Sequence, residues 1–200
     1  MSVVGDRDES TRARLVRVAG ALLEDEGRAA VTLRELGRRA GLSRSAPYRH
    51  FQGKEGLLAA VAADGLRSLH DELVSAKSSV PGSDPVAQLE AMGLAYLRFA
   101  RLNPERYPLI FSRDIGDVDD LNLAEAAGAA SELFVSTVAA GIEQGFLPAA
   151  DPRQLAAAVL ATAHGAADLA GAGHLQPDKW GTDPEGAVSL LLRALDRRGG

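Results

Sequence analysis

The chain has 200 residues, of which 46% are hydrophobic and 24% are charged, a composition typical of a soluble globular protein with one large or two small domains. It contains no cysteine, which excludes disulfides, thiolate metal sites and cysteine nucleophiles. Residues 1–10 are polar and acidic, unlike a signal peptide, and the longest apolar run, 155–163, is too short to span a bilayer. We therefore expect a cytoplasmic protein with no membrane segment.

Almost every segment predicts helix, because apolar residues recur at helical spacing and no stretch alternates in the manner of a strand. We expect an all-α fold of about nine helices. In chain order these are expected at residues 10–26, 33–40, 44–50, 54–78, 85–102, 104–112, 123–144, 152–171 and 184–197. Longer loops are expected at 78–85, at 113–121, which holds four aspartates, and at 171–184, which is rich in Gly and Pro.

Residues 32–51 form the most informative pattern in the chain. Thr32 and Glu35 have the spacing of a capping box, in which the hydroxyl accepts from one amide and the carboxylate reaches back to the other. Gly41 stands where a left-handed residue ends a helix, and Ser43 stands where the next helix is capped. Two short helices joined by such a turn make a helix-turn-helix, whose second helix enters the DNA major groove.

Charge coincides with this pattern. Residues 27–54 hold seven basic residues and one acidic residue, a net charge of +6, so the rest of the chain carries −11. A local basic patch on an acidic protein favours contact with DNA phosphates. The alternative is a solvated basic face, which we favour less because the charge lies on the helix-turn-helix. The seven basic residues are Arg28, Arg34, Arg38, Arg39, Arg44, Arg49 and Lys54.

These residues resemble the TetR family of bacterial one-component transcriptional regulators. The resemblance covers 28–58 and the helix before it, and it is strongest at 48–58, whose sequence is Tyr-Arg-His-Phe-Gln-Gly-Lys-Glu-Gly-Leu-Leu. It implies a three-helix DNA-binding domain at 10–56, with its motif at 32–51, and a C-terminal regulatory, ligand-binding and dimerisation domain at 57–200. Composition alone would place the boundary at the 78–85 loop.

Two positions depart from the family's pattern. Pro47 stands where an apolar side chain such as Leu is usual, and proline fixes φ and removes one backbone donor. We therefore expect a tightened first turn and an altered pose of the second helix. Residues 95–111 resemble a regulatory subtype that carries Trp-His-Gly in its penultimate helix, but here Ala163 precedes His164 and Gly165.

The resemblance implies a set of DNA contacts. Arg44 would pair with a guanine and Ala46 would touch a thymine methyl, whereas Tyr48 and Lys54 would contact phosphate. For His50 a phosphate contact and packing are both open, Arg38 and Arg39 are either phosphate contacts or solvated, and Phe51 is expected in the core. The full set of expected DNA-binding residues is Thr32, Arg34, Ser43, Arg44, Ser45, Ala46, Tyr48, Arg49, His50 and Lys54.

The C-terminal half is expected to make a homodimer. One recognition helix makes few base contacts, so such proteins bind inverted repeats in double-stranded DNA as dimers. The Ala-rich helix at 155–170 and the apolar stripe of the last helix suit a bundle of two helices from each subunit, as the family precedent implies. The alternative is that these Ala-rich helices are merely interior.

Aromatic residues at helical spacing are the candidates for an effector pocket, although such residues are more often core. With few charged residues among them, we expect a largely apolar effector whose binding moves the helix that begins near Lys54 and releases the operator. The candidates are Met92, Tyr96, Phe99, Tyr107, Phe111 and Phe134.

Other functions find little support in the sequence. His164 and Asp168 lie one helical turn apart, but no third ligand has fitting spacing, so we expect no metal and no cofactor. No nucleophile–base pair or phosphate loop is visible, so an enzyme is not expected. The remaining alternative is a DNA-binding regulator that answers to no ligand or to a protein partner. We expect a repressor, although the sequence leaves an activator open.

Overall fold

The computed structural model describes residues 10–112, 115 and 120–199. All regular secondary structure in these ranges is helical, as the sequence predicted. Most of the expected acidic loop at 113–121 lies outside the described residues. The described chain divides into two compact units, one from residues up to 66 with 103–125, the other from 67–102 with 126 onward.

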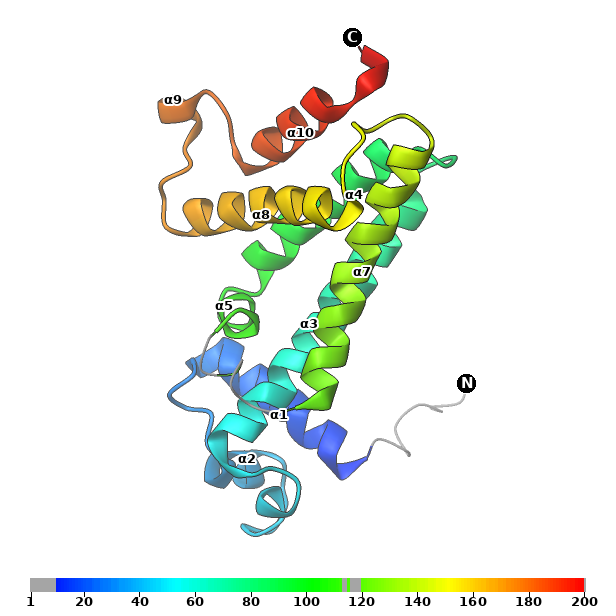
Figure 1. The fold of residues 1–200 in the computed structure, drawn as a ribbon. Helices are drawn as coiled ribbons and strands as arrows, with labels where there is room; N and C mark the ends of the chain where they lie inside the picture. The colour runs from blue at the N-terminus through cyan, green and yellow to red at the C-terminus, as the bar shows by residue number, and fades with distance from the viewer. Residues whose placement is uncertain (1–9, 113–114, 116–119, 200) are drawn as a thin grey trace, which may run out of the picture. The chain divides into compact units, whose positions relative to one another are not determined.

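The first unit is built from short capped helices around one apolar core (Figure 1). Ser10 caps the first helix by accepting from the Ala13 amide at 3.2 Å, and Gly27 ends it with φ of +77°. Leu15, Leu36 and Leu57 are fully buried at its centre. Its elements are α1 (Thr11–Glu26), α2 (Leu33–Arg39), the 3₁₀ helix η1 (Pro47–Arg49), the first half of α3 (Gly53–Ser79) and α5 (Arg106–Ile110).

A partly buried arginine holds α5 within this first unit. The guanidinium of Arg106 lies against Gly20 of α1 and its methylene carbons lie against Gly65 of α3, where an added Cβ would come within 2.4 and 3.0 Å of these atoms. Glu24 accepts from the Arg106 amide at 3.1 Å, and Asp64 lies 3.6 Å from the guanidinium. The glycines thus make room for a side chain that brings a segment from beyond residue 100 onto α1.

The second unit contains longer helices with a buried centre. Asp151 and Asp183 cap α8 and α10, each followed by a proline at the first helical position, as the sequence predicted. Close packing is visible at Gly93, where an added Cβ would lie 2.7 Å from a methyl of Val188. The helices are the second half of α3, α4 (Pro85–Leu102), most of α7 (Leu121–Glu143), α8 (Pro152–Gly171), α9 (Pro177–Trp180) and α10 (Pro184–Leu195), followed by the 3₁₀ helix η2 (Arg197–Gly199).

The loop expected at 171–184 contains a short helix, α9. Pro177 starts it and Gly181 ends it in the left-handed conformation, with its amide donating to the Pro177 carbonyl at 2.8 Å. The Trp180 indole donates to the His174 carbonyl at 2.9 Å. A sequence rich in Gly and Pro was therefore sufficient to predict an interruption between α8 and α10, but not this local turn of helix.

Among the described residues, α7 is long and apolar enough to cross a membrane by length and composition. That is weak support for a span, because core helices of soluble proteins meet the same criteria. In the second unit α7 places Phe134, Thr137 and Val138 in the buried centre. The Thr137 hydroxyl accepts from Lys77 of α3 at 2.9 Å, which ties the helix to its neighbour.

Candidate nucleic-acid interface

The caps of α2 are those that the sequence predicted, with one exception. The Thr32 hydroxyl accepts from the Glu35 amide at 3.2 Å. At the other end Gly41 has φ of +65°, and the Leu42 amide donates to the Gly37 carbonyl at 3.0 Å, a Schellman motif. The expectation that the Glu35 carboxylate reaches back to Thr32 was wrong, because arginine side chains hold that carboxylate instead.

The second helix of the motif is not the α-helix expected at 44–50. Turns lead into the 3₁₀ helix η1, with bonds from the Ala46 amide to the Ser43 carbonyl and from the His50 amide to the Pro47 carbonyl. Pro47 has no N–H to donate to Ser43, so the first α-helical bond cannot form and the chain tightens into i→i+3 bonds. The Ser43 side chain lies 3.3 Å from the Ser45 hydroxyl rather than acting as the expected cap.

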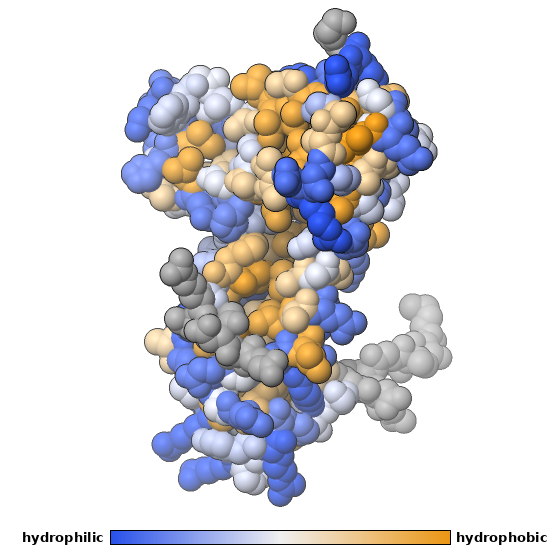
Figure 2. Space-filling model, in the orientation of Figure 1, coloured by the Kyte–Doolittle hydropathy of each residue, from blue (hydrophilic) through white to orange (hydrophobic). Residues whose placement is uncertain are grey.

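Most of the expected DNA-binding residues lie together on the exposed surface of this motif. Tyr48 is 62% exposed, Ala46 and Lys54 are partly buried, and the others are exposed. Figure 2 shows hydrophilic side chains over the end of the first unit that holds α2 and η1. The exposed members are Thr32, Arg34, Ser43, Arg44, Ser45, Tyr48, Arg49 and His50.

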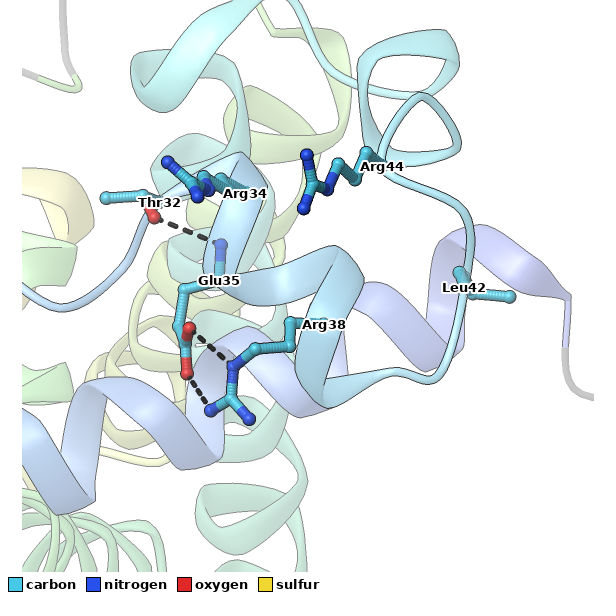
Figure 3. Close-up of a pocket in the computed structure, with 6 residues that line it drawn as sticks. All are labelled: Thr32, Arg34, Glu35, Arg38, Leu42 and Arg44. Atoms are coloured by element: carbon cyan, nitrogen blue, oxygen red, sulfur yellow. Dashed lines mark hydrogen bonds and ion pairs between the residues drawn. The ribbon is translucent and has the colours of Figure 1, made fainter.

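Three of these residues are arginines whose charge is available to a ligand. Within the residues that the structure describes, the guanidinium groups of Arg34, Arg44 and Arg49 form no hydrogen bond or ion pair. Arg34 and Arg44 face a hollow of about 600 Å³ at the junction of α2 and the following turn (Figure 3). The hollow is lined by Thr32, Arg34, Glu35, Arg38, Leu42 and Arg44.

The other two arginines of α2 are paired. Arg38 donates to the two carboxylate oxygens of Glu35 at 2.9 and 2.5 Å, and Arg39 donates to Glu35 at 2.9 Å and also to Glu26. The hydrogen bonds from Arg38 and then from Arg39 lower the pKa of Glu35 to about 2. The i,i+3 and i,i+4 spacings were visible in the sequence, but the contact with Glu26 of α1 was not.

Lys54 and Phe51 anchor the motif to the rest of the first unit. The Lys54 ammonium donates to the Arg28 carbonyl at 2.8 Å, which leaves two of its three hydrogens for another acceptor. Phe51 is 5% exposed, which confirms the expectation of a core position, and Arg12 stacks on its ring at 5.4 Å. His50 is exposed, so packing does not occupy its ring.

The six expected effector residues do not all lie in one unit. Met92, Tyr96, Phe99 and Phe134 are buried in the second unit, whereas Tyr107 and Phe111 belong to the first. Phe111 is 44% exposed and its ring lies 5.3 Å from that of Tyr107. A ligand role for any of the six stays a prediction.

His164 is part of a polar chain in the second unit. The Tyr96 hydroxyl lies 2.9 Å from Nδ1 of His164, and the Asp168 carboxylate lies 3.5 Å from its Nε2. The part of the chain that the structure describes holds no group of three or more His, Asp or Glu side chains arranged for a metal ion. His164 is therefore oriented by a tyrosine and an aspartate.

Comparison with known families agrees with this geometry. Residues 15–61, which contain the motif, match the family described as "Bacterial regulatory proteins, tetR family", and residues 89–195 match "Tetracyclin repressor-like, C-terminal domain". The chain belongs to the TetR family. This assignment makes it a member of a regulator family rather than an enzyme, as expected, whereas the Trp-His-Gly subtype stays a prediction.

Individual solved structures share this fold. A protein of unknown function from Rhodococcus sp. RHA1 is 30% identical, with a TM-score of 0.82 over 96% of this chain and 98% of its own. AibR, solved with isovaleryl coenzyme A and operator DNA, is 16% identical, with a TM-score of 0.62 over 94% and 98% of the two chains.

A named regulator is also similar to this chain. The HTH-type transcriptional regulator Rv1816 of Mycobacterium tuberculosis is 27% identical over 143 residues, which is 70% of this chain. The matched part spans 61% of the length of that relative.

Proposed function

We propose that this chain is a DNA-binding transcriptional regulator, most simply a repressor, which binds an inverted-repeat operator as a homodimer and is released by a small, largely apolar effector. The observation that carries the proposal is a set of three guanidinium groups, Arg34, Arg44 and Arg49, which have no partner among the described residues and are exposed beside a capped helix-turn-helix. In this proposal residues 10–56 bind DNA, and residues 57–200 dimerise and bind the effector.

The DNA face divides its work between bases and phosphates. Arg44 and Ala46 follow the Gly41 turn and lead into η1, so they are the residues proposed to reach base edges. An arginine paired bidentately with guanine discriminates by about 1–3 kcal/mol. Tyr48, His50 and Lys54 are proposed to bind phosphate, which positions the motif without reading sequence.

Dimerisation is supported by the exposed apolar side chains on the last two long helices. Leu169 of α8 is 48% exposed and Leu190 of α10 is 59% exposed, although both helices are otherwise packed in the second unit. A second copy that covers these side chains would present two recognition motifs to half-sites about 34 Å apart. This symmetry predicts a palindromic operator.

Effector binding is proposed to occur at the buried aromatic side chains of the second unit, Tyr96, Phe99 and Phe134, and at Met92, which is also buried there. That AibR was solved with an acyl-coenzyme A and operator DNA is compatible with ligand control on this fold. To move an operator-binding population from 99% to 1%, the effector must prefer the released state by about 5.5 kcal/mol.

Selection of bound duplexes from a random DNA pool tests the proposal. The expected result is an enriched sequence with two inverted half-sites, whose affinity falls steeply with salt. Absence of any enriched duplex at low salt would contradict DNA-binding regulation. Effector control is tested next by a thermal-shift screen against lipophilic molecules, where a stabilising compound should also weaken operator binding.

A further inference from the structure

Four charged side chains on the first unit form an electrically balanced cluster. Glu35 accepts from Arg38 and Arg39, and Glu26 accepts from Arg39, so two carboxylates hold two guanidinium groups. Arg38 is nevertheless 67% exposed, so its side chain lies at the surface even though its charge is matched. The cluster removes two of the seven positive charges that the sequence places on this motif.

Glu35 and Arg38 also line the hollow that Arg34 and Arg44 face (Figure 3). The hollow is therefore lined by two guanidinium groups that have no partner in the described part of the chain and by a third that a carboxylate holds with both of its oxygens. Glu35 occupies two of the five N–H groups of Arg38 and offsets its charge, so a phosphate gains less from Arg38 than from Arg34 or Arg44. A carboxylate inside a proposed DNA interface also repels phosphate unless a cation neutralises it.

We infer that Glu35 is a specificity-determining residue, because it offsets the charge of Arg38 and so lowers the affinity for DNA of any sequence while Arg44 reads bases. Non-specific affinity comes from phosphate neutralisation, whereas discrimination comes from base contacts. Weaker phosphate contacts therefore raise the ratio of the affinity for operator DNA to the affinity for random DNA. The inference rests on the proposed function.

Capping of α2 does not require this carboxylate. The cap of α2 uses the backbone amide of Glu35, which Thr32 accepts, so the cap does not need the carboxylate. With its pKa lowered to about 2, Glu35 stays ionised at every pH at which DNA binding would be measured.

The test is Glu35→Gln, which keeps the backbone amide and the side-chain shape but removes the charge. Binding of the full chain to a random-sequence duplex and to the selected operator is measured across a salt series. We expect the slope of log affinity against log salt to steepen by about one for each bound subunit. Affinity for the random duplex should rise several-fold at low salt and the operator-to-random ratio should fall. An unchanged slope would overturn the inference.

Two further variants identify which arginine side chain Glu35→Gln releases. The double variant Glu35→Gln with Arg38→Gln restores charge balance and should return the slope to that of the wild type. Glu26→Gln is the matched control, because it removes one carboxylate partner of Arg39, which keeps its bond to Glu35 and does not line the hollow. Retention of the steeper slope in the double variant, or an equal steepening with Glu26→Gln, would refute the assignment to Arg38.

Failure of the inference and failure of the proposed function give different results. If the chain is not a DNA-binding protein, the wild type itself binds neither duplex in a salt-dependent way. If only the inference fails, the wild type binds both duplexes and the Glu35→Gln slope matches it. Melting curves for each variant check that the first unit remains folded, and the slope does not depend on the active fraction.

Discussion

The basic motif of the first unit and the aromatic centre of the second unit are built in opposite ways. In the motif, exposed charges stand on short helices fixed by local caps, as with Thr32 and Gly41. In the second unit, buried side chains such as Tyr96 and Phe134 come from different helices that pack over glycines. The motif exposes charges that can bind a polyanion, whereas the buried centre of the second unit depends on packing across several helices. Substitutions should therefore separate binding from stability.

The largest effect is expected in the second unit, at Gly141 of α7. An added Cβ would lie 2.7 Å from Leu147 Cδ1 and 3.3 Å from Pro85 Cβ, so Gly141→Ala should destabilise the fold by about 1–3 kcal/mol. Gly128 lies on the same helix with no atom near its added Cβ, and Gly128→Ala should stabilise by about 0.5–1 kcal/mol. Denaturant unfolding measures both. Equal effects from the two substitutions would contradict the packing described here.

The second effect concerns specificity in the motif. Arg44→Ala should reduce discrimination at one base pair of each half-site by about 1–3 kcal/mol, because it removes a bidentate contact. Repeating the DNA selection with this variant should give a relaxed preference at that position and unchanged melting. A preserved preference at every position would assign base reading to other residues.

Substitution of Lys54 is expected to cause a smaller loss of DNA affinity, which is similar for all DNA sequences. Its ammonium already holds the Arg28 carbonyl and has two hydrogens left for phosphate. Lys54→Ala should weaken operator and random DNA alike and reduce the salt slope by about one per subunit. Titrations of the two duplexes side by side measure this, and a loss confined to the operator would argue against a phosphate role.

The smallest effect is a dependence on pH at the end of the second unit. Side-chain and then backbone hydrogen bonds with Arg198 lower the pKa of Asp196 to about 2. A carboxylate with a lowered pKa stabilises the fold when the pH is above the ordinary pKa of 3.8. This stabilisation is lost as the pH falls toward 2. The melting temperature of the wild type should therefore exceed that of Arg198→Ala by more at neutral pH than at about pH 2. A difference in melting temperature that increases as the pH falls would contradict this prediction.

Local physical rules predicted the parts of this molecule that neighbouring residues determine. The caps at Thr32, Gly41 and Asp151, and the change that Pro47 imposes on the second helix, each depend on a few adjacent residues. The 3₁₀ form of η1 was not predicted in full, because the sequence pattern does not show how much of the helix survives the lost donor.

Such local rules did not predict contacts between residues that are distant in the sequence. The pairing of Arg39 with Glu26 joins two helices. The packing of the Arg106 side chain against Gly20 and Gly65 brings together residues that are far apart in the chain. Both depend on tertiary packing that no local pattern encodes. The same reason limits the prediction of the effector residues, two of which, Tyr107 and Phe111, belong to the first unit.

Backbone amide chemical shifts of the full chain, measured while operator duplex is added, identify the residues that contact DNA. We expect the largest changes between Thr32 and Lys54, with Arg34, Arg44 and Arg49 among them. The neutral cluster at Arg39 should change less. Shift changes concentrated in the second unit, with residues 32–54 unaffected, would contradict this expectation.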